Sequence, residues 1–158
     1  MRACLLALVV GAMVIVAGCS SVVDDDVRVS TRTYAYTAYD STGAAVVQGT
    51  MRVDFREVEA TECERDCSAF RLAGRWSFEQ TRDAEQIGTQ VGEGPLRGSV
   101  QENGEAYINL NPEVEDNNVT LRGEFEDGHL RSLQGEWAYQ SWTLINSGPF
   151  EAERESTL

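Results

Sequence analysis

Leu121-Arg122-Gly123-Glu124-Phe125 is the stretch that decides the fold, because it is one of five copies of the same pentad. Each copy has an apolar residue at both ends and a glycine in the middle, with any residue in between. The other copies begin at Val47, Leu72, Leu96 and Leu133, so successive starts lie 25, 24, 25 and 12 residues apart. This spacing predicts one β-hairpin for each long step and one strand for the short step.

The pentads are typical of strands because their pattern repeats every two residues. Residues i, i+2 and i+4 of a strand point to one face, so both apolar residues and the glycine share the predicted buried face. Glycine inside a strand costs stability and therefore needs a structural reason. A sharp bend in a closing sheet is one reason, and room for an aromatic ring from the neighbouring strand is another. Both favour a small, strongly curved barrel.

Eight strands are predicted from alternating apolar residues and from turn signals such as Asp127-Gly128. Their expected ranges are 27–39, 44–58, 68–82, 95–102, 105–111, 118–126, 129–140 and 146–154. Leu130 and Leu133 have opposite parity, which predicts a β-bulge near Arg131-Ser132. The fold class is therefore all-β: an antiparallel up-and-down meander of about eight strands that closes into a small barrel, with an open β-sandwich as the alternative.

An eight-stranded up-and-down barrel resembles the lipocalin architecture. Gly74-Arg75-Trp76 and Gly135-Glu136-Trp137 also match the Gly-x-Trp string of that family. Lipocalins carry the string on their first strand, whereas here it falls on the third and seventh predicted strands. The resemblance is therefore architectural, and no binding residue is carried over from it.

The first 18 residues have the proportions of a secretory signal. Arg2 supplies a positive end, and an uncharged apolar run follows from Ala3 to Ala17. The ending Val16-Ala17-Gly18-Cys19 resembles the lipobox of bacterial lipoproteins. That resemblance implies removal of residues 1–18, acylation of Cys19 with palmitate-type chains and a stable membrane anchor, since each buried methylene contributes about 0.8 kcal/mol. An ordinary secreted protein cut elsewhere is the alternative.

Residues 19–26 form the predicted lipidated tether, and residues 27–158 form the barrel domain. Ser20 after the lipidated cysteine resembles the outer-membrane class of enteric lipoproteins. The run Asp24-Asp25-Asp26 resembles the surface-export signal of Bacteroidota lipoproteins, or is a solvated spacer. The expected location is the cell envelope at the outer membrane, on its periplasmic face or its outer surface.

The mature chain is strongly acidic, with 12 arginines, no lysine and 26 acidic residues. Its formal charge is −14, one unit beyond the −13 of the full chain because Arg2 is removed. Such a charge disfavours both nucleic acid and anionic membrane surfaces as partners. The lysine-free acidic surface resembles proteins of salt-loving bacteria, and GC-rich coding is an equal alternative.

Cys63 and Cys67 are the only cysteines of the mature chain besides Cys19. In an oxidising envelope such a pair is typical of a structural disulfide. Closing so short a loop would contribute on the order of 2 kcal/mol. Metal binding and redox catalysis are weaker alternatives, because there is no second cysteine pair and the spacing is C-x₃-C.

Six aromatic residues share the predicted inward parity and are the candidate interior, ligand-facing residues: Trp76, Phe78, Phe125, Trp137, Tyr139 and Phe150. They are expected either to fill the barrel or to line a cavity for a small apolar ligand, since eight strands allow both outcomes. The two functional hypotheses follow from this choice. One is a lipid-anchored envelope protein with a structural or interaction role, and the other is a lipocalin-like carrier or sensor of a small apolar ligand.

Catalysis is not expected, and neither a metal nor a cofactor is expected. The single histidine, His129, follows a predicted turn, and no Gly-x-Ser-x-Gly elbow accompanies it. The acidic loop Pro112–Asn118 offers oxygen ligands that calcium accepts, but its spacing differs from an EF-hand and a solvated turn explains it as well. The expected partners are the membrane, reached through the lipid on Cys19, and an envelope protein or a small apolar ligand.

Overall fold

A computed structural model describes residues 29–58, 68–83, 87–114, 116–126 and 129–156. Its eight strands are β1 (Val29–Tyr39), β2 (Ala45–Glu57), β3 (Ser68–Gln80), β4 (Gly92–Gln101), β5 (Glu105–Asn109), β6 (Asn118–Phe125), β7 (Ser132–Gln140) and β8 (Leu144–Arg154). Each coincides with a predicted strand to within three residues at its ends, as expected for boundaries set by tertiary contacts. The described residues contain no helix long and apolar enough to span a membrane.

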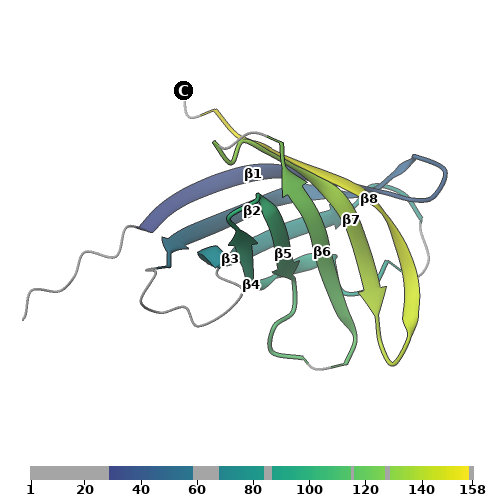
Figure 1. The fold of residues 1–158 in the computed structure, drawn as a ribbon. Coiled ribbons are helices and arrows are strands. Elements are labelled where there is room, and N and C mark those ends of the chain that lie inside the picture. The colour runs from purple at the N-terminus through teal and green to yellow at the C-terminus, as the bar shows by residue number, and fades with distance from the viewer. Residues whose placement is uncertain (1–28, 59–67, 84–86, 115, 127–128, 157–158) are drawn as a thin grey trace, which may run out of the picture.

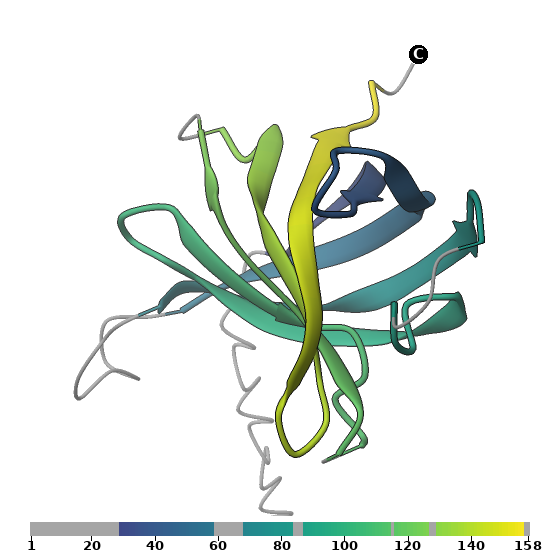
Figure 2. The same cartoon turned by 90° about the vertical axis from the view of Figure 1, so that its right-hand side faces the viewer.

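The strands form one closed barrel in the order β1-β2-β3-β4-β5-β6-β7-β8, and every neighbouring pair is antiparallel. Strand β8 closes the barrel by pairing with β1 from Tyr34↔Arg154 to Ala38↔Phe150. In Figure 1, β1–β4 run across the view while β6–β8 run steeply down it, so the two halves cross at a large angle. Figure 2 shows β8, in yellow, crossing the front of the barrel. The predicted barrel is confirmed, and the open sandwich is not what forms.

The pentad glycines lie where the backbone of a neighbouring strand leaves no room for a Cβ atom. A Cβ atom added at Gly123 would lie 2.1 Å from the backbone oxygen of Gln134, and one at Gly135 would lie 2.0 Å from that of Arg122. The pentad glycines of β2, β3 and β4 have the same kind of contact, at 2.0 to 2.1 Å from a backbone oxygen. Close backbone approach in a strongly bent sheet therefore applies to all five glycines. Room for a neighbouring aromatic ring applies as well at Gly49, where the added Cβ would lie 3.0 Å from the Phe78 ring.

The apolar residues that flank these glycines are all buried, so the predicted inward face is confirmed. Leu121 is 1% exposed and Leu133 is 2% exposed, and both belong to one continuous core. Strand β1, whose buried face the sequence left ambiguous, contributes Tyr34, Tyr36 and Ala38 to this core. One core inside one closed sheet is the arrangement expected of a small barrel.

Side chains from loops and strand ends close both ends of the barrel. At the near end, where β1 begins, Arg32 donates hydrogen bonds to the carbonyl oxygens of His129 (2.6 Å) and Leu130 (3.2 Å). At the far end, where β1 stops, Ile87 and Gln90 are buried. Tyr36 donates to Gln90 Oε1 at 3.1 Å, and burial raises the pKa of its hydroxyl, which keeps it neutral.

The prediction of a β-bulge near Arg131-Ser132 is wrong. Strand β7 starts at Ser132, and its pairing with β8 is regular from there to Tyr139. The change of parity is made before the strand by Leu130, which has a left-handed backbone with φ of 55° and is 8% exposed. The change of parity therefore takes place in the turn before β7. A residue with a left-handed backbone redirects the chain there without disturbing the hydrogen bonds between β7 and β8.

Replacing Asp40 by Asn is expected to weaken the β1–β2 turn at neutral pH. Asp40 Oδ1 accepts hydrogen bonds from Thr42 N (2.8 Å), Thr42 Oγ1 (2.6 Å) and Ala44 N (3.0 Å). These hydrogen bonds lower the pKa of the Asp40 carboxyl group, and the Thr42 hydroxyl contributes most. A lowered folded pKa stabilises the protein above the ordinary pKa of Asp, about 3.9, and this stabilisation disappears as the pH falls through the folded value. Urea midpoints of wild type and Asp40→Asn should therefore differ at pH 7 and converge as the pH falls below the lowered pKa of Asp40. A difference that is independent of pH would contradict this account.

Candidate functional site

Five of the six aromatic residues predicted to face the interior are buried in the core. They are Trp76, Phe78, Phe125, Trp137 and Phe150, and they are between 0% and 6% exposed. The indole nitrogens have backbone partners: Trp76 Nε1 donates to Leu110 O at 2.7 Å, and Trp137 Nε1 donates to Tyr39 O at 2.8 Å. The sixth, Tyr139, is half-buried toward the far end, and its hydroxyl donates to Asn117.

These rings pack against one another and against β1. Tyr36 stacks on Phe78 with ring centroids 4.3 Å apart, and Trp76 lies 5.0 Å from Phe78. Toward the near end, Phe125 lies 6.2 Å from Phe55. These centroid separations are those of favourable aromatic pairs, so Trp76, Phe78 and Phe125 each pack against another protein ring.

A narrow gap remains between the side chains in the near half of the core. Its lining consists of Tyr34, Met51, Val53, Phe55, Leu72, Ile108, Phe125 and Leu133. The space outside atoms totals about 200 Å³, and none of it admits a water molecule. A site for a small molecule needs several hundred ångström cubed of open volume. This part of the interior is therefore filled, and the core aromatics there act as packing.

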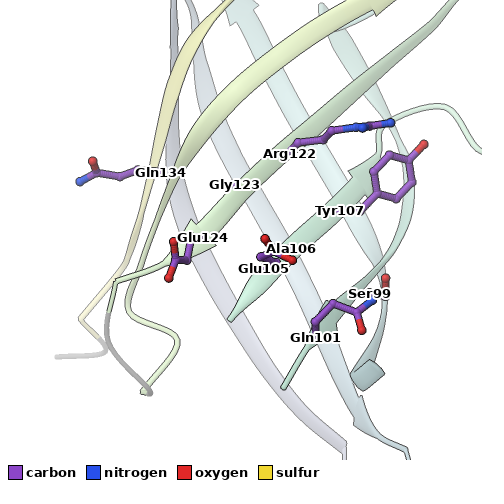
Figure 3. Close-up of a pocket in the computed structure, with 9 residues that line it drawn as sticks. All are labelled: Ser99, Gln101, Glu105, Ala106, Tyr107, Arg122, Gly123, Glu124 and Gln134. Carbon is purple, nitrogen blue, oxygen red and sulfur yellow. The ribbon is translucent and has the colours of Figure 1, made fainter. Parts of the chain in front are cut away.

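An open depression lies on the outside of the barrel, over β4–β7 (Figure 3). It has a volume of about 610 Å³ and is open to solvent, and we call it the outer groove. Its lining residues are Ser99, Gln101, Glu105, Ala106, Tyr107, Arg122, Gly123, Glu124 and Gln134. Ala106 and Gly123 have inward parity, so the strand backbone itself forms part of the wall.

Strand register arranges the polar residues of the outer groove in two rows. Tyr107 lies opposite both Ser99 and Arg122, and the Arg122 guanidinium carbon is 5.5 Å from the Tyr107 ring centroid. Figure 3 shows the Arg122 side chain extended toward that ring. In the second row, Glu124 lies opposite both Glu105 and Gln134. One row thus carries a cation on an aromatic ring, and the other carries carboxylates and an amide.

This arrangement is suited to binding a polar molecule. The carboxylate row accepts hydrogen bonds, the Arg122 guanidinium donates them, and the Tyr107 ring, 39% exposed, offers an apolar surface. Sequence reasoning missed the outer groove. The outward parity of its residues was readable, but the curvature and the register that bring four strands together were not.

The other predicted sites have different outcomes. Cys19, Cys63 and Cys67 lie outside the described residues, so the lipid anchor and the disulfide stay predictions. Among the residues that are described, no three His, Cys, Asp or Glu side chains form a group that could hold a metal ion. His129 is exposed at the near end, where its carbonyl oxygen is used by Arg32.

Comparisons with known proteins identify no relative of this chain. No protein-family model matches it, and neither the curated proteins nor the solved structures gave a match. What the fold establishes is an eight-stranded closed antiparallel barrel, an architecture consistent with that of lipocalins.

Proposed function

We propose that this protein is a lipid-anchored lipoprotein of the cell envelope that acts through its outer surface, in a structural or interaction role. The lipobox-like ending Val16-Ala17-Gly18-Cys19 supports the anchor. The barrel begins at Val29, ten residues after Cys19. An extended tether of that length reaches about 35 Å, which holds the barrel beside the membrane.

The tight packing of aromatic rings in the interior is the observation that favours an interaction role over a carrier role. A carrier must hold its ligand in a cavity, whereas here Phe78 packs against Tyr36 and Trp76. The outer groove, by contrast, presents exposed side chains of Tyr107, Arg122 and Glu124. The proposed role is therefore non-enzymatic binding of an envelope partner on the outside of the barrel, at the outer membrane.

Substituting Cys19 by Ser is expected to move the protein from the membrane fraction to the soluble fraction. The acyl chains on Cys19 are the only membrane attachment that the proposal requires. The measurement is fractionation of the native host followed by a carbonate wash. Cys63→Ser is the matched control and should leave the protein in the membrane fraction. A Cys19→Ser protein that stays on membranes after the wash would overturn the anchor.

The soluble domain is expected to show a single ligand-free mass in native mass spectrometry. Among the described residues, the gap inside the core admits no water molecule, so no apolar guest is expected there, although a lipocalin-like barrel is compatible with a carrier role. The measurement compares the native and denatured masses of the Cys19→Ser protein purified from its host. A stoichiometric apolar adduct in the native spectrum would favour the carrier hypothesis instead.

A further inference from the structure

The turn between β7 and β8 carries the most exposed large apolar side chain among the described residues. Trp142 is 86% exposed, and Leu144, two residues further on, is 59% exposed. Both belong to residues 137–150, the longest run without a charged residue after the first 26 residues, although 25% of the chain is charged. A single exposed apolar residue is ordinary, but two of them within an uncharged run indicate a binding surface.

These side chains lie at the tip of a hydrogen-bonded hairpin, residues 140–146, which we call the prong. Pairing of β7 with β8 continues to Gln140↔Leu144, next to the turn. Pairing of β8 with β1 ends at Ala38↔Phe150, so the prong extends past the closed wall of the barrel. Figure 1 and Figure 2 show this hairpin reaching out from the far end. Because its backbone is already ordered by strand pairing, the prong loses little conformational freedom on binding.

An acidic loop lies beside the prong. The loop joins β5 to β6, and β6 begins at Asn118, which pairs with Gln140 at the base of the prong. The loop carries Val114, 41% exposed, and the exposed carboxylates of Glu113 and Asp116. Figure 1 and Figure 2 both show the loop and the hairpin side by side. The far end therefore has an aromatic, uncharged centre and a charged rim, which is the layout of a protein-binding surface.

We propose that the prong inserts into an apolar pocket of an envelope protein whose rim carries lysine or arginine. A convex tip fits a concave partner, and a tryptophan buried at the centre of an interface often dominates its binding energy. A basic rim is electrostatically complementary to Glu113 and Asp116. The same two acids disfavour the other occupants. They would repel an anionic lipid surface, and in a two-fold dimer through the prong they would lie near their own copies.

This contact is a second surface for the interaction role and the envelope location proposed above, on which the inference rests. The prong shares no residue with the outer groove, whose lining comes from β4–β7 at other positions. The two surfaces can therefore be tested separately in the same protein.

Site-specific photocrosslinking of the full-length chain in its native host tests the inference. The photoreactive probe, p-benzoylphenylalanine, replaces Thr143, which is exposed beside Trp142. Irradiated cells should give one dominant adduct with another protein, and mass spectrometry should place the crosslink among apolar residues with lysine or arginine nearby. Adding Trp142→Ala should lower the adduct yield at least about tenfold, as expected when a central tryptophan is removed. Adding Glu113→Gln and Asp116→Asn should also lower the yield, because the charges of the rim are lost.

Two controls accompany this experiment. The same probe at Ser77, exposed on the outer face of β3, should give no such adduct. Removing two exposed acids at the near end, Glu102→Gln and Glu155→Gln, should leave the yield from position 143 within about twofold. A missing adduct, equal yields at positions 143 and 77, a crosslink mapped to an acidic surface, or an unchanged yield with Trp142→Ala or with the two substitutions in the acidic loop would overturn the inference.

An adduct with lipid or with a second copy of the chain would also overturn the inference, and would identify that occupant instead. The probe at Gln134 examines the outer groove in the same cells. A protein adduct at position 134 with none at 143 would reject the prong and keep the proposed interaction role. Fractionation of Cys19→Ser measures the anchor alone, so a failure of the envelope location is detected separately.

Discussion

Gly123→Val is expected to lower the free energy of unfolding by at least about 3 kcal/mol, the upper end of ordinary overpacking. The added Cβ alone would lie 2.1 Å from Gln134 O and 3.2 Å from Gly135 Cα. These are backbone atoms of the neighbouring strand, held by the β6–β7 ladder, and Gly123 lies opposite Gly135 in that ladder. Unlike a flexible side chain, they cannot move aside without breaking strand pairing.

Glu124→Val is the matched control, one residue along and on the exposed face. It should change the free energy of unfolding by less than about 0.5 kcal/mol. Gly123→Ala sharpens the test, because the clash begins at Cβ and alanine should already lose a large part of the stability. Urea melts of the three variants are the measurement. Equal midpoints for Gly123→Val and Glu124→Val would show that the two faces of the sheet have been assigned the wrong way round.

Trp137→Ala is expected to cost about 3–5 kcal/mol, the range for removing a large buried aromatic side chain. Trp137 is 0% exposed, and its Nε1 donates to Tyr39 O at 2.8 Å, across the barrel wall from β7 to the end of β1. The truncation leaves a cavity and also leaves the Tyr39 carbonyl without this donor. The hydrogen bond lies near the seam between β8 and β1, so we expect the closure of the barrel to weaken first.

Trp142→Ala is the control with the same chemistry on the surface. Trp142 is 86% exposed in the turn between β7 and β8, so its removal should change stability by less than about 0.5 kcal/mol. Urea unfolding followed by circular dichroism compares the two variants without relying on tryptophan fluorescence. Comparable losses would mean that Trp137 does not hold the interior position described for it.

Much of the fold was readable from the sequence, since side-chain alternation in a strand is a local property. The parity of Leu121, Gly123 and Phe125 predicted which residues face inward, and the turn signals predicted where each strand stops. The strand count and the closed antiparallel meander followed from these two signals. Only the buried face of β1 stayed ambiguous, because tyrosines, threonines and alanines alternate there without a clear apolar contrast.

The layout of the outer surface depends on strand register. Arg52 and Arg75 are both outward by parity, yet only the pairing of β2 with β3 places them opposite each other. In the same way, Tyr107 and Arg122 meet because β5 pairs with β6. Register is set by contacts between residues far apart in the sequence, so no local pattern reveals it.

What the sequence by itself determined is the alternation of inward and outward residues and the strands, while the lipoprotein-like start of the chain stays a prediction. What only the tertiary structure decided is the state of the interior and the layout of the exterior. Whether the inward aromatics fill the barrel or line a cavity depends on how Tyr36, Trp76 and Phe78 pack in three dimensions, and there they fill it. The physical reason is that parity is set within one strand, whereas packing and curvature are set jointly by all eight.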